Sequence, residues 1–91
     1  MIYKPKIRKA ILSFIQNDKK YLKGKLVFPS ETRISSRLNM HHKTLRAYLR
    51  FFMRNNIITN VSNTPHKKAY KITDSGEEYL NKVQKMLKNE R

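Results

Sequence analysis

The stretch ISSRLNMHHKTLRAYL (residues 34–49) decides the fold of this 91-residue chain. Its apolar residues stand at the offsets 0, 4, 6, 11 and 14, which suit two helices separated by one turn: Ile34, Leu38, Met40, Leu45 and Tyr48. Asn39 stands in the gap, and asparagine tolerates the left-handed conformation that a tight corner needs. Ser35 is small where two helices would approach each other closely. We therefore expect two short helices that meet at a steep angle.

Helix signals continue on both sides of this stretch. Ser30 is a natural N-cap, and Glu31 stands in the first turn of the helix that follows it. The next helix is expected from about His42 to Asn55, where a pair of asparagines can end it. Its inward side chains recur at helical spacing: Leu45, Tyr48, Leu49 and Phe52. Phe51 cannot share their direction, so it packs under the first helix or is exposed for a partner.

The first part of the chain predicts one helix and one short strand. Pro5 suits a first helical turn, and an apolar stripe continues the helix to about Asn17. That stripe consists of Ile7, Ala10, Ile11, Phe14 and Ile15. Residues 18–25 are basic, and we expect them to form a connector. Residues 26–28 are β-prone and are stopped by the proline that follows.

The last third of the chain predicts a hairpin and a final helix. Residues 57–61 are rich in β-branched side chains and residues 69–73 alternate, so we expect paired strands around a polar loop. Residues 74–77 resemble a capping box with Asp74 as the cap. The helix that follows has an apolar stripe of Tyr79, Leu80, Val83, Met86 and Leu87. The expected order is α-β-α-α-β-β-α, an α+β fold that occupies residues 1–91 as one domain.

The charge of the chain is large and unevenly distributed. Lysine and arginine number 21 against 6 acidic residues, for a net charge of +15. The net charge is +7 over residues 1–25, +8 over residues 26–73 and zero over residues 74–91. A compact body with this charge repels itself unless its usual partner is a polyanion. We expect the polyanion to bind the first three quarters of the chain.

The composition also excludes several classes of protein. The chain has no cysteine, which excludes disulfides, cysteine-based zinc sites and thiol catalysis. Few acidic groups and no Gly-rich phosphate loop argue against an enzyme. Two of the three histidines are adjacent and point in divergent directions, so we expect no metal and no cofactor. No apolar run approaches the roughly 18 residues of a membrane span, and the basic start lacks the apolar segment of a signal peptide.

In the order of its segments the chain resembles a winged helix-turn-helix domain. The segments RLNMHHKTLR (residues 37–46), RNNII (residues 54–58) and YKITDSGE (residues 70–77) are similar to those of bacterial and archaeal regulators of the MarR and PadR type. Asn39 stands where that family usually has glycine. Small basic proteins of this kind also resemble archaeal, plasmid and archaeal-virus regulators. The resemblance implies a helix-turn-helix over about residues 30–55, a wing over about residues 57–73 and a C-terminal helix over about residues 74–89.

The resemblance further implies a transcriptional regulator, a repressor, that binds double-stranded DNA of specific sequence through its third helix. The residues expected to contact base edges are His41, His42, Lys43, Thr44, Arg46, Ala47 and Arg50. Arg46 and Arg50 are the best candidates for guanine, because the guanidinium fork matches its O6 and N7 atoms. The residues expected to contact phosphate are Ser30, Arg33, Arg37, Arg54, His66, Lys67 and Lys68.

The composition of the wing and the length of the chain limit which DNA contacts and which ligands we expect. The wing carries lysine and His66 rather than arginine, so we expect it to contact the DNA backbone without entering the minor groove. The chain lacks the extra helices with which larger relatives enclose a ligand. No small-molecule ligand is therefore expected.

The uncharged C-terminal segment is the natural place for two copies to meet. Its apolar stripe can pair with that of the first helix, which would give a homodimer on a pseudo-palindromic site. The expected interface residues are Ile7, Ile11, Phe14, Tyr79, Leu80, Val83, Met86 and Leu87. The alternative is that both stripes cover the core of a single chain, which a thin domain of this length also needs.

Two other functions fit the same residues. The first is a DNA-binding protein of plasmid or viral replication or partition, whose copies spread along repeats. The second is a winged-helix module that binds protein or structured RNA. For the leading interpretation we expect a cytoplasmic protein associated with the nucleoid, or one in the host cytoplasm if it is viral.

Overall fold

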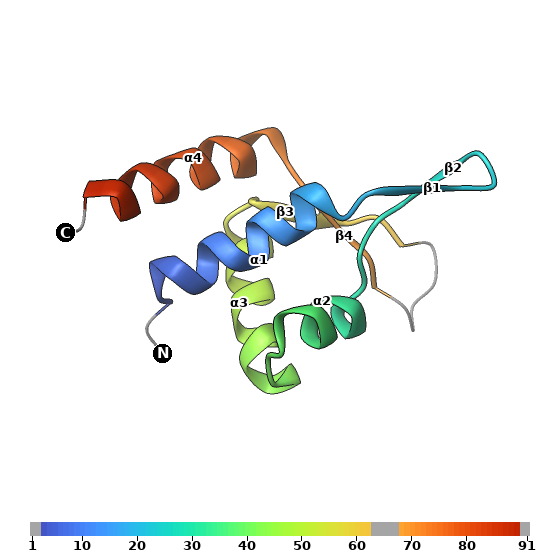
Figure 1. The fold of residues 1–91 in the computed structure, drawn as a ribbon, viewed down its shortest axis with the longest axis horizontal. Helices are drawn as coiled ribbons and strands as arrows, with labels where there is room; N and C mark the ends of the chain where they lie inside the picture. The colour runs from blue at the N-terminus through green and yellow to red at the C-terminus, as the bar shows by residue number, and fades with distance from the viewer. Residues whose placement is uncertain (1–2, 63–67, 90–91) are drawn as a thin grey trace.

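The computed structural model describes residues 3–62 and 68–89. Within these ranges the chain forms four helices and two antiparallel hairpins (Figure 1). The elements are, in chain order, α1 (Pro5–Asn17), β1 (Lys20–Leu22), β2 (Lys25–Val27), α2 (Glu31–Leu38), α3 (His42–Arg54), β3 (Ile58–Asn60), β4 (Tyr70–Ile72) and α4 (Asp74–Asn89). The expected α+β fold is confirmed, with β1 added to the expected order α-β-α-α-β-β-α. No helix in these two ranges is long and apolar enough to cross a membrane.

The core lies between the helices and the sheet formed by β3 and β4. Helix α1 packs along α4 and against β4, and α2 packs against α3. The buried apolar side chains are Ile11, Leu12, Ile15, Ile34, Leu45, Tyr48, Leu49, Phe52, Ile57, Ile58, Tyr70, Ile72, Leu80 and Val83. Phe51 stacks on Tyr3, which lies just before the start of α1, and the two ring centroids are 4.3 Å apart. The apolar stripes expected for the helices supply most of the core, but in α1 the expected Ala10 is exposed and Leu12, which was not expected, is buried.

The corner between α2 and α3 has the expected geometry. Asn39 is left-handed, with a φ of 52°. Ser35 is buried and its hydroxyl donates to the carbonyl oxygen of Met40 at 2.6 Å, which ties the end of α2 to the turn. The Ser30 hydroxyl accepts the Arg33 N–H at 3.2 Å and so caps α2, as expected. These contacts fix how α3 is held relative to α2.

The connector expected over residues 18–25 is wrong, because most of it folds into a hairpin. Strands β1 and β2 pair antiparallel, with Tyr21 opposite Leu26. Lys23 and Gly24 form the turn with φ values of 52° and 77°. A two-residue loop with two positive φ values matches the twist of a hairpin, and a lysine followed by glycine can adopt it. The second strand of this hairpin, β2, begins at Lys25, one residue before the β-prone run expected over residues 26–28.

The wing, formed by β3 and β4, is joined to the segment that leads into α2. The register of β3 and β4 places Ile58 opposite Ile72 and Asn60 opposite Tyr70. The Tyr70 N–H donates to the carbonyl oxygen of Pro29 at 2.9 Å. The chain after β2 therefore runs beside the wing as a third, very short extended segment.

The start of α4 differs from the expected capping box by one residue. The hydroxyl of Thr73, and not Asp74, accepts the Gly76 N–H, at 2.9 Å. The same hydroxyl also lies 2.7 Å from the carbonyl oxygen of Asn56, which anchors the helix start to the end of α3. Gly76 is buried, and a Cβ atom there would lie 2.0 Å from the carbonyl oxygen of Ile57. Glycine is thus needed for α4 to approach the wing this closely.

Candidate nucleic-acid interface

The solvent-facing side of α3 carries a row of basic residues, because the opposite side of the helix is in the core. The buried stripe of α3 is at most 2% exposed. The exposed basic row consists of Lys43, Arg46, Arg50 and Arg54. Lys43, Arg50 and Arg54 form no ion pair with any residue in the ranges that the structure describes. These cations are available to an anion outside the chain.

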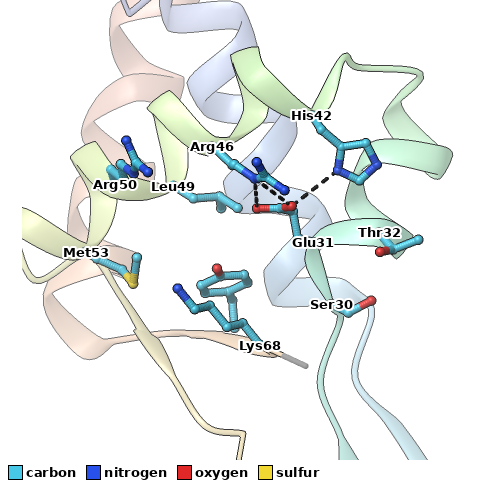
Figure 2. Close-up of a pocket in the computed structure, with 10 residues that line it drawn as sticks. Ser30, Glu31, Thr32, His42, Arg46, Leu49, Arg50, Met53 and Lys68 are labelled. Atoms are coloured by element: carbon cyan, nitrogen blue, oxygen red, sulfur yellow. Dashed lines mark hydrogen bonds and ion pairs between the residues drawn. The ribbon is translucent and has the colours of Figure 1, made fainter. Parts of the chain in front are cut away.

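A groove lies between this basic row, the start of α2 and the wing (Figure 2). Its polar walls include Ser30, Glu31, Arg46, Arg50 and Lys68. Three of these five side chains are cations and one is a carboxylate. The groove is open to solvent and therefore suits an extended polyanion better than an enclosed small molecule.

Glu31 holds Arg46 and His42 together in this groove. Arg46 Nε donates to both carboxylate oxygens, at 3.2 Å to Oε1 and 3.1 Å to Oε2 (Figure 2). His42 Nδ1 lies 3.2 Å from Oε2. The sequence predicts Glu31 only as part of the first turn of α2, so its place in the site was missed. A signal was present, since Glu31 is the only acidic residue between Lys19 and Thr73.

The other residues expected to contact bases lie at the start and along the side of α3. His41 is exposed, and its Nδ1 accepts the Lys43 N–H at 3.2 Å, which caps the helix. Thr44 and Ala47 are half-buried. They offer less surface to a partner than the exposed arginines of the basic row.

Arg33 differs from the other expected phosphate contacts because it is already paired. Its Nη2 donates to Asp18 Oδ1 at 2.8 Å, and its Nε donates to Asp18 Oδ2. The hydrogen bond from Arg33 lowers the pKa of Asp18, and the same bond raises the pKa of Arg33. This ion pair joins the end of α1 to α2. The ion pair has a structural role. Because Arg33 is already bound to Asp18, it is the weakest candidate among the residues expected to contact phosphate.

Of the remaining expected phosphate contacts, Ser30 and Lys68 line the groove, Arg37 and Arg54 do not, and two lie outside the described residues. Three are exposed side chains, namely Arg37, Arg54 and Lys68. Ser30 is half-buried at the start of α2, where its hydroxyl is occupied as the N-cap. The two that lie outside the described residues are His66 and Lys67.

The expected dimer residues lie on α1 and α4, which pack against each other within one chain. Three of them are covered by the core of that chain: Ile11, Leu80 and Val83. The others keep exposed surface: Ile7, Phe14, Tyr79, Met86 and Leu87. Met86 is the most accessible, at 41% exposed. Ile7, Phe14 and Tyr79 also pack against the core, so the alternative of a stripe that covers its own core accounts for six of the eight residues and not for Met86 and Leu87.

Solved structures share this fold. The transcriptional regulator BldR of Sulfolobus solfataricus matches with a TM-score of 0.72 and 13% identity, over 92% of this chain and 55% of that one. PadR of Bacillus subtilis in complex with operator DNA matches with a TM-score of 0.64 and 21% identity, over 86% and 46%. A protein of Archaeoglobus fulgidus matches with a TM-score of 0.65 and 15% identity, over 96% and 89%. This chain spans about half the length of the first two.

The sequence itself matches a family model. A comparison with curated proteins gives no match. The model of the winged helix-turn-helix family matches residues 4–91, which include every helix and strand described above. The resemblance expected from the sequence is therefore confirmed, and the chain belongs to the winged helix-turn-helix family.

Proposed function

We propose that this chain is a transcriptional regulator that binds double-stranded DNA of specific sequence. The observation that carries the proposal is the exposed basic row of α3, three of whose four members have no ion-pair partner among the described residues. In helix-turn-helix proteins the helix in this position lies in the major groove. Arg46 and Arg50 would there meet guanine O6 and N7, which a guanidinium fork can contact through two hydrogen bonds.

The electrostatics of the surroundings support the same function. The net charge of the chain is +15, and the acidic residues outside Asp18 and Glu31 all lie at or after Asp74. Arg37 on α2 and Lys68 beside β4 flank the basic row with exposed positive charge. Such side chains bind phosphates and fix the register of the protein on the duplex without reading sequence.

The similar structures support a duplex rather than another polyanion. PadR was solved with operator DNA and BldR is a transcriptional regulator, and both share the fold of this chain over most of its length. A chain with the same helix pair and wing is expected to present its third helix to DNA in a related way. We therefore take an operator-like duplex as the target of the basic row.

We infer further that the protein acts as a homodimer and a repressor. Met86 of α4 is 41% exposed, and the half-buried Ile7, Phe14, Tyr79 and Leu87 add partial surface that a second copy can cover. A two-fold dimer would place its α3 helices about one duplex turn apart, roughly 34–36 Å, and would require a pseudo-palindrome. A protein bound over such a site near a promoter blocks access to it, which is the basis for repression.

Selection of binding sites from a random pool of duplexes, with the full chain, tests the proposal. We expect two related half-sites, and a binding constant that falls by about 10³–10⁵ between 50 and 200 mM salt because some six to ten phosphates are neutralised. Structured RNA of equal length serves as the control. Uniform spreading along long DNA without a preferred site would favour replication or partition, and tighter binding to the RNA would favour an RNA-binding module. Either result would contradict the proposal.

A further inference from the structure

The β1–β2 hairpin projects from the molecule and adds no buried residue to the core. Every residue of the two strands is exposed. The exposed apolar side chains are Tyr21 (77%), Leu22 (57%), Leu26 (39%) and Val27 (41%). A two-stranded hairpin with neither face covered is only marginally stable in water. Four large apolar side chains on such an element indicate that a partner covers it.

The charge of the hairpin shows what kind of partner fits. Its lysines are Lys19, Lys20, Lys23 and Lys25, and residues 19–30 include no acidic residue. Two cross-strand pairs set a lysine opposite an aliphatic side chain, Lys20 with Val27 and Lys25 with Leu22. The partner must therefore offer negative charge together with apolar surface, as the phosphates and deoxyriboses of a DNA backbone do. A second copy of this chain would bring the same excess of positive charge.

The two chain segments at the base of the hairpin are bonded to elements that form the groove beside α3. In the segment that follows β2, the Pro29 carbonyl oxygen accepts the Tyr70 N–H of the wing. In the segment that precedes β1, Asp18 is ion-paired with Arg33 of α2. The hairpin and the wing therefore project from the same end of the molecule (Figure 1). Ser30, just after the hairpin, lines the groove beside α3 (Figure 2).

We propose that the β1–β2 hairpin is a second wing, which contacts the DNA backbone beyond the base pairs that α3 and the first wing cover. The inference rests on the proposed DNA-binding function. The lysines neutralise phosphates, and the cross-strand pair of Tyr21 and Leu26 packs against deoxyribose. A three-residue strand is about 10 Å long, so the hairpin lengthens the contact by about three base pairs per protomer. These contacts strengthen binding without reading sequence.

Charge removal at the tip of the hairpin tests the proposal. The variant is Lys23→Gln with Lys25→Gln, and the matched control is Lys82→Gln with Lys85→Gln on α4; all four lysines are exposed. Thermal melting followed by circular dichroism verifies that both variants fold. On a selected site with long flanks, we expect the hairpin variant to lose about three base pairs of hydroxyl-radical protection at each end. Raising the salt from 50 to 200 mM should also lower its binding constant by a smaller factor than for the wild type. The two factors should differ about tenfold per protomer, because the variant has lost two phosphate contacts.

Two further measurements separate the hairpin from general effects of charge. Trimming the flanks of the duplex should weaken the wild type about tenfold and weaken the hairpin variant less, because the variant has already lost the contacts of Lys23 and Lys25 with those base pairs. Tyr21→Ser should weaken binding equally at all salt concentrations, since it removes apolar contact and no charge. The selected sequence should be the same for every one of these proteins.

A hairpin variant that matches the α4 control in salt dependence, footprint and response to trimming overturns the inference. The wild type still selects a duplex in that case, so the proposed function stands. A wild type that binds no duplex overturns both. If the hairpin variant keeps the wild-type footprint and loses binding to phosphatidylserine vesicles, the hairpin binds an anionic lipid surface instead, and the inference is again overturned.

Discussion

Glu31 brings a negative charge to a surface that otherwise carries positive charge. Its carboxylate accepts two hydrogen bonds from Arg46 Nε, which fixes one edge of the guanidinium. Neither terminal nitrogen of Arg46 forms a hydrogen bond with this carboxylate, so both can still donate to a base edge. The same charge repels phosphates that approach the groove in the wrong register. If the groove binds DNA as proposed, we expect Glu31 to favour discrimination between sites over raw affinity.

Replacing Glu31 with glutamine keeps the shape of the side chain and removes its charge. We expect Glu31→Gln to bind non-specific duplex about fivefold more tightly, a change of about 1 kcal/mol, and to lower the ratio of specific to non-specific affinity. Fluorescence anisotropy with a selected and a scrambled duplex measures both. Glu77→Gln, an exposed position on α4, is the control. Weaker or unchanged non-specific binding by Glu31→Gln would argue against this role.

The ion pair between Asp18 and Arg33 predicts a pH-dependent contribution to stability. The hydrogen bond from Arg33 lowers the pKa of Asp18 below the ordinary value of 3.8. Because the folded pKa is the lower one, this contribution is fully present above pH 3.8 and is lost as the pH falls through the folded value. We expect Asp18→Asn to lower the free energy of unfolding by about 1–2 kcal/mol at pH 7.

Urea unfolding of wild type and Asp18→Asn at pH 7 and pH 2 measures this contribution. The difference between the two proteins should be smaller at pH 2, because this pH lies below the ordinary pKa of 3.8 and the unfolded wild type takes up a proton at Asp18 more readily than the folded protein does. Glu78→Gln, an exposed carboxyl group on α4, is the control and should show little difference at pH 7. An equal difference between wild type and Asp18→Asn at both pH values would refute the assignment to the ion pair.

At the scale of elements, the helices could be predicted because each buries one stripe of side chains. The spacing of apolar residues gave α1 and α3 almost their observed bounds, and Asn39 was recognised as the corner. Strands β1 and β2 are both fully exposed and show no pattern of burial; β2 was predicted only from its β-prone residues, and β1, in a lysine-rich segment, was not predicted. Its remaining signal was the Lys23-Gly24 turn. Thr73 and Asp74 are both good caps, and only the packing of α4 on the wing decides between them.

The candidate site divides in the same way. The exposed face of α3 follows from helical periodicity, so Arg50 could be placed on it from the sequence. The pairing of Glu31 with Arg46 could not be predicted, because it depends on the angle at which α2 and α3 meet. The ion pair of Asp18 likewise depends on how the end of α1 packs beside α2.

The close approach of α4 to the wing predicts a large effect of a small substitution. A Cβ at Gly76 would lie 2.0 Å from the Ile57 carbonyl oxygen, so α4 must shift to accept it. We expect Gly76→Ala to lower the free energy of unfolding by about 1–3 kcal/mol. Ser75→Ala, in the same turn and exposed, should change it by less than about 0.5 kcal/mol. Denaturation followed by circular dichroism compares the two, and an equal effect of both would show that the helix start is not constrained by Ile57.

At the scale of the whole molecule, the charge distribution separates the proposed DNA-binding region from the proposed dimer surface. The entire net charge of +15 lies on residues 1–73, and residues 74–91 are neutral. The exposed side chain of Met86 and the neighbouring Leu87 lie at the uncharged end of the chain, where Leu87 and Ala10 line a hollow between α4 and α1. Lys6 and Lys9 of α1 also line this hollow, so two copies that meet there bring together like charge from α1 and no net charge from α4. The proposed homodimer therefore uses surface that the DNA does not need.

A single charge on this surface tests the dimer. We expect Met86→Glu to convert the wild-type dimer into a folded monomer that binds a two-half-site duplex about 100-fold more weakly, because the second half-site is no longer engaged by a linked copy. Asn81→Glu adds the same charge to an exposed position of the same helix and should leave the dimer intact. Sedimentation at micromolar concentration reports both. A wild type that sediments as a monomer and protects one half-site would exclude the proposed dimer.

The central claim is that α3 reads base sequence, and the sites selected from random duplexes by wild type, Arg50→Ala and Lys68→Ala test it most directly. We expect Arg50→Ala to lose preference at one position in each half-site and to bind the wild-type site about 1–3 kcal/mol more weakly. Lys68→Ala should bind all sequences about equally more weakly and should select the wild-type site, because it contacts phosphate. If Arg50→Ala instead selects the wild-type sequence at every position, α3 does not read the DNA through Arg50, and the claim is contradicted.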